Sequence, residues 1–109
     1  MNSIELLDKD WLHLISNRTV ASLARFKYPK FVEWYGETTE DEYFVIRMRK
    51  GFLLVGIDET QYGAEANLQV VGIADCSPIF TSITTGIPHI HDILDVLNWE
   101  LVDDDAYFE

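Results

Sequence analysis

The spacing of apolar residues changes twice along this chain, and the changes predict helices first, then strands, then one more helix. In the first part, apolar side chains recur every three or four residues, which is the period of an amphipathic helix. That spacing predicts a first helix over about 3–16, followed over about 19–26 by either a shorter second helix or a continuation of the first. The aromatic segment between Pro29 and Gly36 is predicted as a third short helix or turn, although its composition also suits a strand.

From residue 43 the apolar period becomes two residues, which is typical of a strand with one face on the core. The pair Lys50-Gly51 allows a tight reversal, so the first two predicted strands form a hairpin. Strands are predicted over 43–49, 52–57, 68–74 and 79–84, with a polar loop over 58–67 between the second and the third.

The last periodic stretch predicts a helix that begins near Pro88. Its apolar stripe consists of Ile90, Ile93, Leu94, Leu97 and Leu101. The order of elements predicts an α+β fold, with N-terminal helices, an antiparallel sheet of three to four strands and a C-terminal helix packed on that sheet. No flexible linker interrupts the pattern, so residues 1–109 are expected to form a single domain.

Size and composition are those of an ordinary globular protein. The chain has 109 residues, of which 48% are hydrophobic, and its one cysteine, Cys76, has no partner for an intramolecular disulfide. Neither a signal peptide nor an apolar stretch long enough to span a membrane is visible. We therefore expect a cytoplasmic protein that makes no contact with a membrane.

Charge is distributed unevenly along the chain, because Lys50 is its last basic residue. Residues 1–50 hold eight Lys and Arg against eight Asp and Glu, whereas residues 51–109 hold eleven Asp and Glu and no Lys or Arg. The formal net charge of −11 therefore belongs to the second part. Such a field attracts cationic partners and opposes nucleic acid, whose binding depends mainly on phosphate contacts.

These observations predict a small acidic domain that recognises a basic surface of a protein partner, as inhibitors, immunity proteins and nucleic-acid mimics do. Carboxylates would steer the encounter and aromatic side chains would supply buried area. The candidate partner-binding residues are Asp58, Glu59, Tyr62, Glu65, Asp92, Asp95, Trp99, Asp103, Asp104, Asp105, Tyr107 and Phe108. The acidic tail over 102–109 either frays in solvent or docks on the partner.

The sequence contains no motif with specific chemistry, so no catalytic, metal-binding or cofactor-binding residues are predicted, and the chain is not expected to be an enzyme. His91 and Asp95 share a helix face, but a hydrogen-bonded pair at that spacing is more common than a metal site. Cys76 follows Asp75, whose charge opposes formation of a reactive thiolate. The glycines are too scattered to form a phosphate-binding loop.

The same sequence suggests two alternative functions. The first is a self-associating structural module, a homodimer in which one face of the predicted hairpin meets the acidic part of a second copy. That face carries Tyr43, Val45, Arg47 and Arg49. The second alternative is a small-ligand-binding or catalytic α+β domain, with a pocket between sheet and helices that His91, Asp95 or Tyr43 would line.

Overall fold

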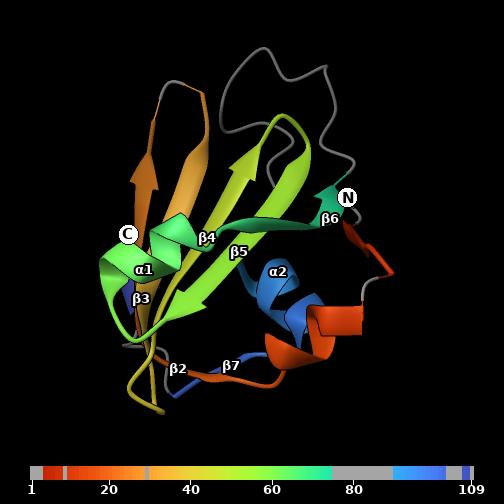
Figure 1. The fold of residues 1–109 in the computed structure, drawn as a ribbon. Helices are drawn as coiled ribbons and strands as arrows, with labels where there is room; N and C mark the ends of the chain where they lie inside the picture. Colours follow the sequence, from red (N-terminus) through yellow and green to blue (C-terminus); the bar gives the residue numbers. More distant parts are fainter. Residues whose placement is uncertain (1–3, 9, 29, 75–89, 103–106, 109) are drawn as a thin grey trace.

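The computed structural model of the chain describes residues 4–8, 10–28, 30–74, 90–102 and 107–108 (Figure 1). Its strands are β1 (Ile4–Leu6), β2 (Thr19–Lys27), β3 (Val32–Thr38), β4 (Tyr43–Arg49), β5 (Phe52–Asp58), β6 (Gln69–Ala74), β7 (Glu100–Leu101) and β8 (Tyr107–Phe108). Its helices are the 3₁₀ helix η1 (Asp10–Leu14) and two α-helices, α1 (Gln61–Ala66) and α2 (Ile90–Leu97). The described part of the chain is therefore mostly β.

The strands form one mixed sheet in the order β1-β6-β5-β4-β3-β2-β7, and β8 also pairs with β2. Neighbours from β1 through to β2 are antiparallel, whereas β7 and β8 run parallel to β2. Helix α2 contacts β1 at one edge of the sheet and leads directly into β7 at the other edge. The sheet consequently curls as a half-barrel around α2 (Figure 1).

The predicted α+β fold with N-terminal helices and a sheet of three to four strands is wrong. Where a helix was predicted over 3–16, the chain forms β1 and η1, and β1 pairs with β6 at the sheet edge. The segments predicted as the second and third helices are β2 and β3, two neighbouring strands. Local apolar spacing is a weak signal, and strand pairing across the sheet overrides it here.

A β-bulge explains why β2 resembles a helix in the sequence. The register between β2 and β3 shifts between Val20 and Ser22, so Ala21 is an extra residue in the ladder. Val20 and Leu23 therefore both face the core, with exposed fractions of 0% and 1%, although they are three residues apart. Residues three apart also share one face of a helix, so the sequence alone cannot distinguish a bulged strand from a helix here.

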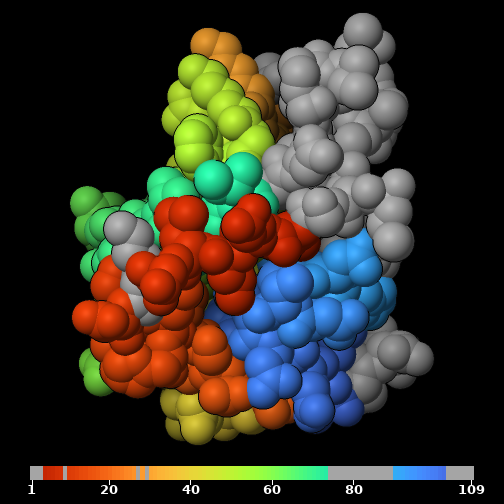
Figure 2. All heavy atoms as spheres, turned by 90° about the vertical axis from the view of Figure 1, so that its right-hand side faces the viewer, coloured from red at the N-terminus to blue at the C-terminus, as the bar shows by residue number. Residues whose placement is uncertain are grey.

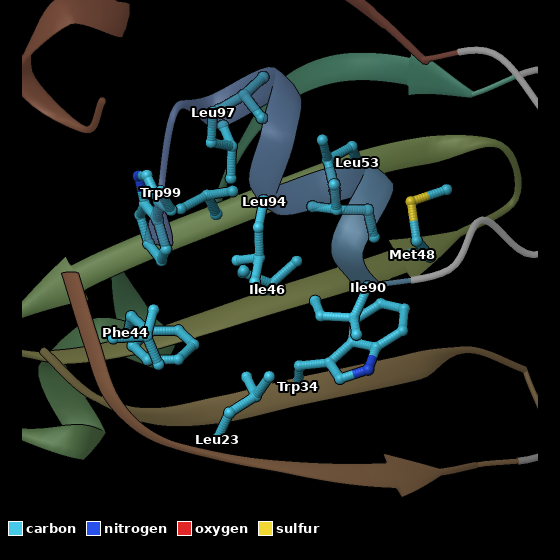
Figure 3. Close-up of a cluster of buried hydrophobic side chains, with 14 of the residues drawn as sticks. Leu23, Trp34, Phe44, Ile46, Met48, Leu53, Ile90, Leu94, Leu97 and Trp99 are labelled. Atoms are coloured by element: carbon cyan, nitrogen blue, oxygen red, sulfur yellow. The ribbon is translucent and has the colours of Figure 1, made fainter. Parts of the chain in front are cut away.

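Strands β4, β5 and β6 lie where strands were predicted over 43–49, 52–57 and 68–74, and β4 alternates as expected. Phe44, Ile46 and Met48 are buried against α2, together with Leu53 of β5 and Trp34 of β3 (Figure 3). The ring of Phe44 meets that of Trp99 edge to face, with 5.3 Å between centroids. The core thus fills the concave side of the half-barrel.

Helix α2 also lies where its apolar stripe predicted a helix, and Ile90, Ile93, Leu94 and Leu97 are its buried residues. Leu101, the last residue of the predicted stripe, lies beyond the helix in β7. The helix ends at Leu97, and the next residue, Asn98, adopts the left-handed conformation (φ 59°) common after a helix C-terminus. Helix α1 was missed, because only Ala64 of its residues is buried. Thr60 caps α1 by accepting a hydrogen bond from the amide of Gly63 (2.9 Å).

The amino-terminal segment, red and orange in Figure 2, lies beside α2 on the surface of the molecule. Trp99 secures this arrangement, because its indole Nε1 donates a hydrogen bond to the carbonyl of Ile15 (2.6 Å). The radius of gyration is 13.0 Å, and about 13 Å is usual for a compact domain of roughly 100 residues.

Several sequence predictions lie outside the described residues: the strand over 79–84, Cys76, and the start of the last helix at Pro88. None of the described helices is both long and apolar enough to cross a membrane.

Candidate functional site: the acidic end of the sheet

Antiparallel pairing gathers carboxylates from two connections at one end of the sheet. Tyr43, the first residue of β4, is paired with Glu37 of β3 on one side and with Asp58 of β5 on the other. The β3–β4 turn and the start of the β5–α1 connection therefore lie together, at the lower end of the sheet in Figure 1. We call this surface the acidic end; it consists of Glu37, Glu40, Asp41, Asp58 and Glu59.

Local hydrogen bonds fix both connections. In the β3–β4 turn, the buried hydroxyl of Thr38 donates to Oε1 of Glu42 (3.2 Å) and accepts from the amide of Glu40 (3.2 Å). After β5, Oδ2 of Asp58 accepts from the amide (3.2 Å) and the hydroxyl (3.1 Å) of Thr60. The turns are thus held by short polar side chains, and the longer acidic side chains extend into solvent.

Arg18 lies beside these carboxylates, and its guanidinium is fully engaged. Nε of Arg18 donates to Glu42 (2.9 Å) and lies 3.7 Å from Oε2 of Glu40. Its other nitrogens donate to the carbonyls of Ser16 (2.8 Å) and Leu14 (2.7 Å). Arg18 therefore neutralises Glu42, which is half-buried, more than Glu40, whose side chain is 66% exposed.

Three other carboxylates of the acidic end are not neutralised by a described basic residue. Glu37, Asp41 and Glu59 are exposed, and within the described residues no ion pair involves their carboxylates. Uncompensated surface charges of one sign add up to a field that reaches beyond the protein surface, about 8–10 Å at physiological ionic strength.

At the opposite end of the sheet, the exposed charged residues that the structure describes in the turns are basic. Lys30, Arg49 and Lys50 are exposed in or beside the β2–β3 and β4–β5 turns, at the top of Figure 1. We call these three residues the basic end. Apolar side chains are also exposed nearby, including Phe26 (48%) and Phe52 (46%).

Four of the predicted partner-binding residues lie at the acidic end or on the neighbouring helix α1. Asp58 and Glu59 belong to the acidic end itself, and Tyr62 on α1 is 84% exposed. Glu65, also on α1, lies 3.5 Å from Arg47, so this carboxylate is partly neutralised. Arg47 also bonds to Glu33 (2.6 Å).

The remaining predicted partner-binding residues do not join this group. Asp92 and Asp95 are exposed on α2, across the sheet from α1, because α1 covers Gly56 whereas α2 packs on the opposite face at Val55. Trp99 is 3% exposed and belongs to the core. Asp103, Asp104 and Asp105 lie outside the described residues. Tyr107 and Phe108 form β8, which pairs with Leu23 and Ala24 of β2.

Sequence reasoning missed Glu37, Glu40 and Asp41 as site residues, although a signal for two of them existed. The predicted hairpin already implied that Tyr43 is paired with Asp58, which brings the acidic turn before Tyr43 to the acidic residues after β5. Glu37 required the β3–β4 pairing as well, and that pairing was hidden because β3 was predicted mainly as a helix.

Within the described part of the chain, two pockets flank the acidic end, one on each face of the sheet. The inner pocket, of about 520 Å³, lies between η1 and β5. Trp11, Val55 and Ile57 give it apolar walls, and the Arg18–Glu42 pair with Asn67 and Gln69 gives it a polar rim.

The outer pocket, of about 210 Å³, lies on the convex face where β2, β3 and β4 meet the start of α1. Its lining side chains include Tyr35, Tyr43, Glu37, Ser22 and Gln61. None of the described residues that line it is a Lys or an Arg.

The hairpin face proposed for self-association is not a free surface. Val45 is 3% exposed, and the side chain of Arg47 is 18% exposed because it packs over the Phe31 ring (4.5 Å to the centroid) and pairs with carboxylates. Only Arg49 of the charged residues on this face is exposed.

No group of three or more His, Cys, Asp or Glu side chains in the described ranges is arranged to hold a metal ion. His89 lies outside those ranges, and His91 is exposed on α2. Comparison of the chain with protein-family models, curated proteins and solved structures finds no match. The fold and the charge distribution are therefore the grounds on which a function can be proposed.

Proposed function

We propose that the protein is a small acidic binding domain that recognises a basic surface on a protein partner through the acidic end of its sheet. The observation that carries this proposal is the collection of exposed carboxylates at one end, of which Glu37, Asp41 and Glu59 have no described ion-pair partner. Inhibitors, immunity proteins and nucleic-acid mimics are the functional types that use such a surface.

The proposed mechanism begins with electrostatic steering. Because acidic and basic groups occupy opposite ends of the sheet, the molecule has a dipole along its strands, and a cationic partner is drawn to one end in one orientation. The two turns of the acidic end are held by Thr38 and Thr60, so little backbone order is lost on binding.

Buried area would come from side chains beside the carboxylates. Tyr62, the most exposed large hydrophobic residue described, projects from α1 close to Glu59 in the sequence. Tyrosine supplies a rigid apolar surface and a polar tip, which makes it a common anchor in interfaces. Trp99 has no part in this proposal, since its side chain is in the core.

The test measures association with a cationic probe, a nonapeptide of arginine, by stopped-flow fluorescence at several salt concentrations. We expect the association rate constant to fall at least tenfold between about 10 and 300 mM salt, because steering acts through the screened field. A rate constant that does not change with salt, or the absence of binding at low salt, would contradict the proposed function.

The inner pocket supports a second candidate function, the binding of a small ligand. Its volume of about 520 Å³ is within the usual range for ligand sites, roughly 300–1,000 Å³, and it combines apolar walls with an ion pair. Leu14 also lines it and is 60% exposed, so Leu14→Trp would fill the pocket without changing the core. If a metabolite panel raises the melting temperature of the wild type, and not of that variant, this candidate replaces the first.

A further inference from the structure

We infer that the outer pocket receives one arginine side chain of the basic partner. This inference rests on the proposed function and adds to it a specific subsite and the chemistry that the subsite selects. Three properties of the pocket carry it: its size, its charge and its aromatic lining.

The size of the outer pocket suits a side chain better than a cofactor. Its volume of about 210 Å³ is below the range of roughly 300–1,000 Å³ that drug-sized ligands and cofactors occupy. The pocket opens on the convex face beside the acidic end, where a docked partner would present its side chains.

The charge of the pocket selects a cation. Glu37 lines it and is exposed, and its carboxylate forms no hydrogen bond or ion pair with the described residues. Across Tyr43 from Glu37 lies Asp58, whose Oδ2 is occupied by the Thr60 cap. Glu37 is therefore the carboxylate available to pair with an incoming cation, and no described lining residue is positively charged to oppose it.

The aromatic lining favours a guanidinium over an ammonium. Tyr35 and Tyr43 both line the pocket, and the ring of Tyr35 is held by a parallel stack on Phe26, with 5.1 Å between centroids. A guanidinium stacks on aromatic faces and bonds a carboxylate through two parallel N–H groups, whereas an ammonium is a more strongly hydrated point charge.

The test compares two nonapeptides of equal charge, one of arginine and one of lysine, by titration calorimetry. Wild type is expected to bind the arginine peptide about fivefold more tightly. Glu37→Gln and Tyr43→Leu should each reduce this preference to less than twofold. Tyr43→Phe keeps the ring and should retain the preference. Glu59→Gln removes a charge from the acidic end outside the pocket, so it should weaken both peptides equally.

The outcomes separate the inference from the proposed function. If both peptides bind with no preference, or if the preference survives in folded Glu37→Gln and Tyr43→Leu, the pocket is not the arginine site although the acidic end still binds cations. If neither peptide binds wild type, the proposed function fails and the inference fails with it. Melting temperatures within a few degrees of wild type establish that the variants are folded.

Discussion

The acidic end and the basic end belong to one sheet, and the same strands connect them. β4 begins between Glu37 and Asp58 at the acidic end and finishes at Arg49, beside Lys50, at the basic end. In the sequence, by contrast, the division of charge is between the first and the second half of the chain. Antiparallel pairing therefore brings charged residues from both halves of the chain to the same end of the sheet, because every hairpin returns the chain to the end where it began. The distribution of charge in space consequently differs from its distribution along the sequence.

The two ends also differ in how their cations are used. Arg18, near the acidic end, bonds two carbonyls and a carboxylate and is 17% exposed in its side chain. Arg49 and Lys50 are exposed, and within the described residues neither forms an ion pair. Arg18 thus stabilises the fold, whereas Arg49 and Lys50 contribute only to the electrostatic field of the basic end.

Charge reversal at the acidic end is expected to have the largest effect. The double substitution of Glu40→Lys and Glu59→Lys should lower the association rate constant for the arginine nonapeptide by about 100-fold at low salt, because repulsion replaces attraction at the docking surface. Stopped-flow measurement checks this.

The matched control for charge reversal lies on α2. Asp92→Lys with Asp95→Lys changes the net charge by the same amount and should lower the rate constant by less than about tenfold, since these residues lie across the sheet. Equal losses in the two double variants would mean that net charge alone decides binding, and the comparison between regions would be wrong.

The next largest effect is expected from loss of Arg18, and the quantity that changes is the stability of the fold. Arg18→Met removes the partner of half-buried Glu42 and two donors to backbone carbonyls, which should lower the free energy of unfolding by about 2 kcal/mol. Urea denaturation measures this change. Arg49→Met at the basic end is the control, and its effect should stay within about 0.5 kcal/mol. If both variants lost similar free energy of unfolding, Arg18 would stabilise the fold no more than solvent-exposed Arg49 does.

The smallest effect is expected from reversing charge at the basic end. β4 has seven residues joined by six rises of about 3.4 Å, so the two ends are separated by about 20 Å, at least twice the screening length of about 8–10 Å. Lys30→Glu with Arg49→Glu should therefore change the affinity for the arginine nonapeptide by less than about twofold at 0.15 M salt. A large gain or loss in calorimetry would show that the basic end takes part in recognition.

Strands β4, β5 and β6 and helix α2 could be predicted from the sequence, whereas the fold class and the strands before β4 could not. β4 has a period of two, β5 begins with a continuous apolar run and α2 has an apolar stripe, so local pattern and final structure agree there. In β2 the bulge at Ala21 gives core residues a helical interval, and in β1 the strand exists because β6 pairs with it. Such long-range pairing cannot be recognised from the local spacing of apolar residues.

The site could be predicted in part, for the same reason. Asp58 and Glu59 were proposed from charge, and the predicted hairpin contained enough information to add Glu40 and Asp41. Asp92 and Asp95 were grouped with Asp58 and Glu59 because all four follow Lys50, in the part of the chain without Lys or Arg, but α1 and α2 lie on opposite faces of the sheet. Glu37, and with it the outer pocket, depends on a strand that the sequence pattern did not favour.

The central claim is that cationic partners bind the acidic end and not the acidic surface of α2. Two-dimensional ¹⁵N NMR during titration with the arginine nonapeptide tests it most directly, because every backbone amide reports separately. We predict that the largest shift changes fall on residues 37–43 and 58–62. Largest changes on residues 91–96, or small changes spread evenly over the sheet, would contradict the claim.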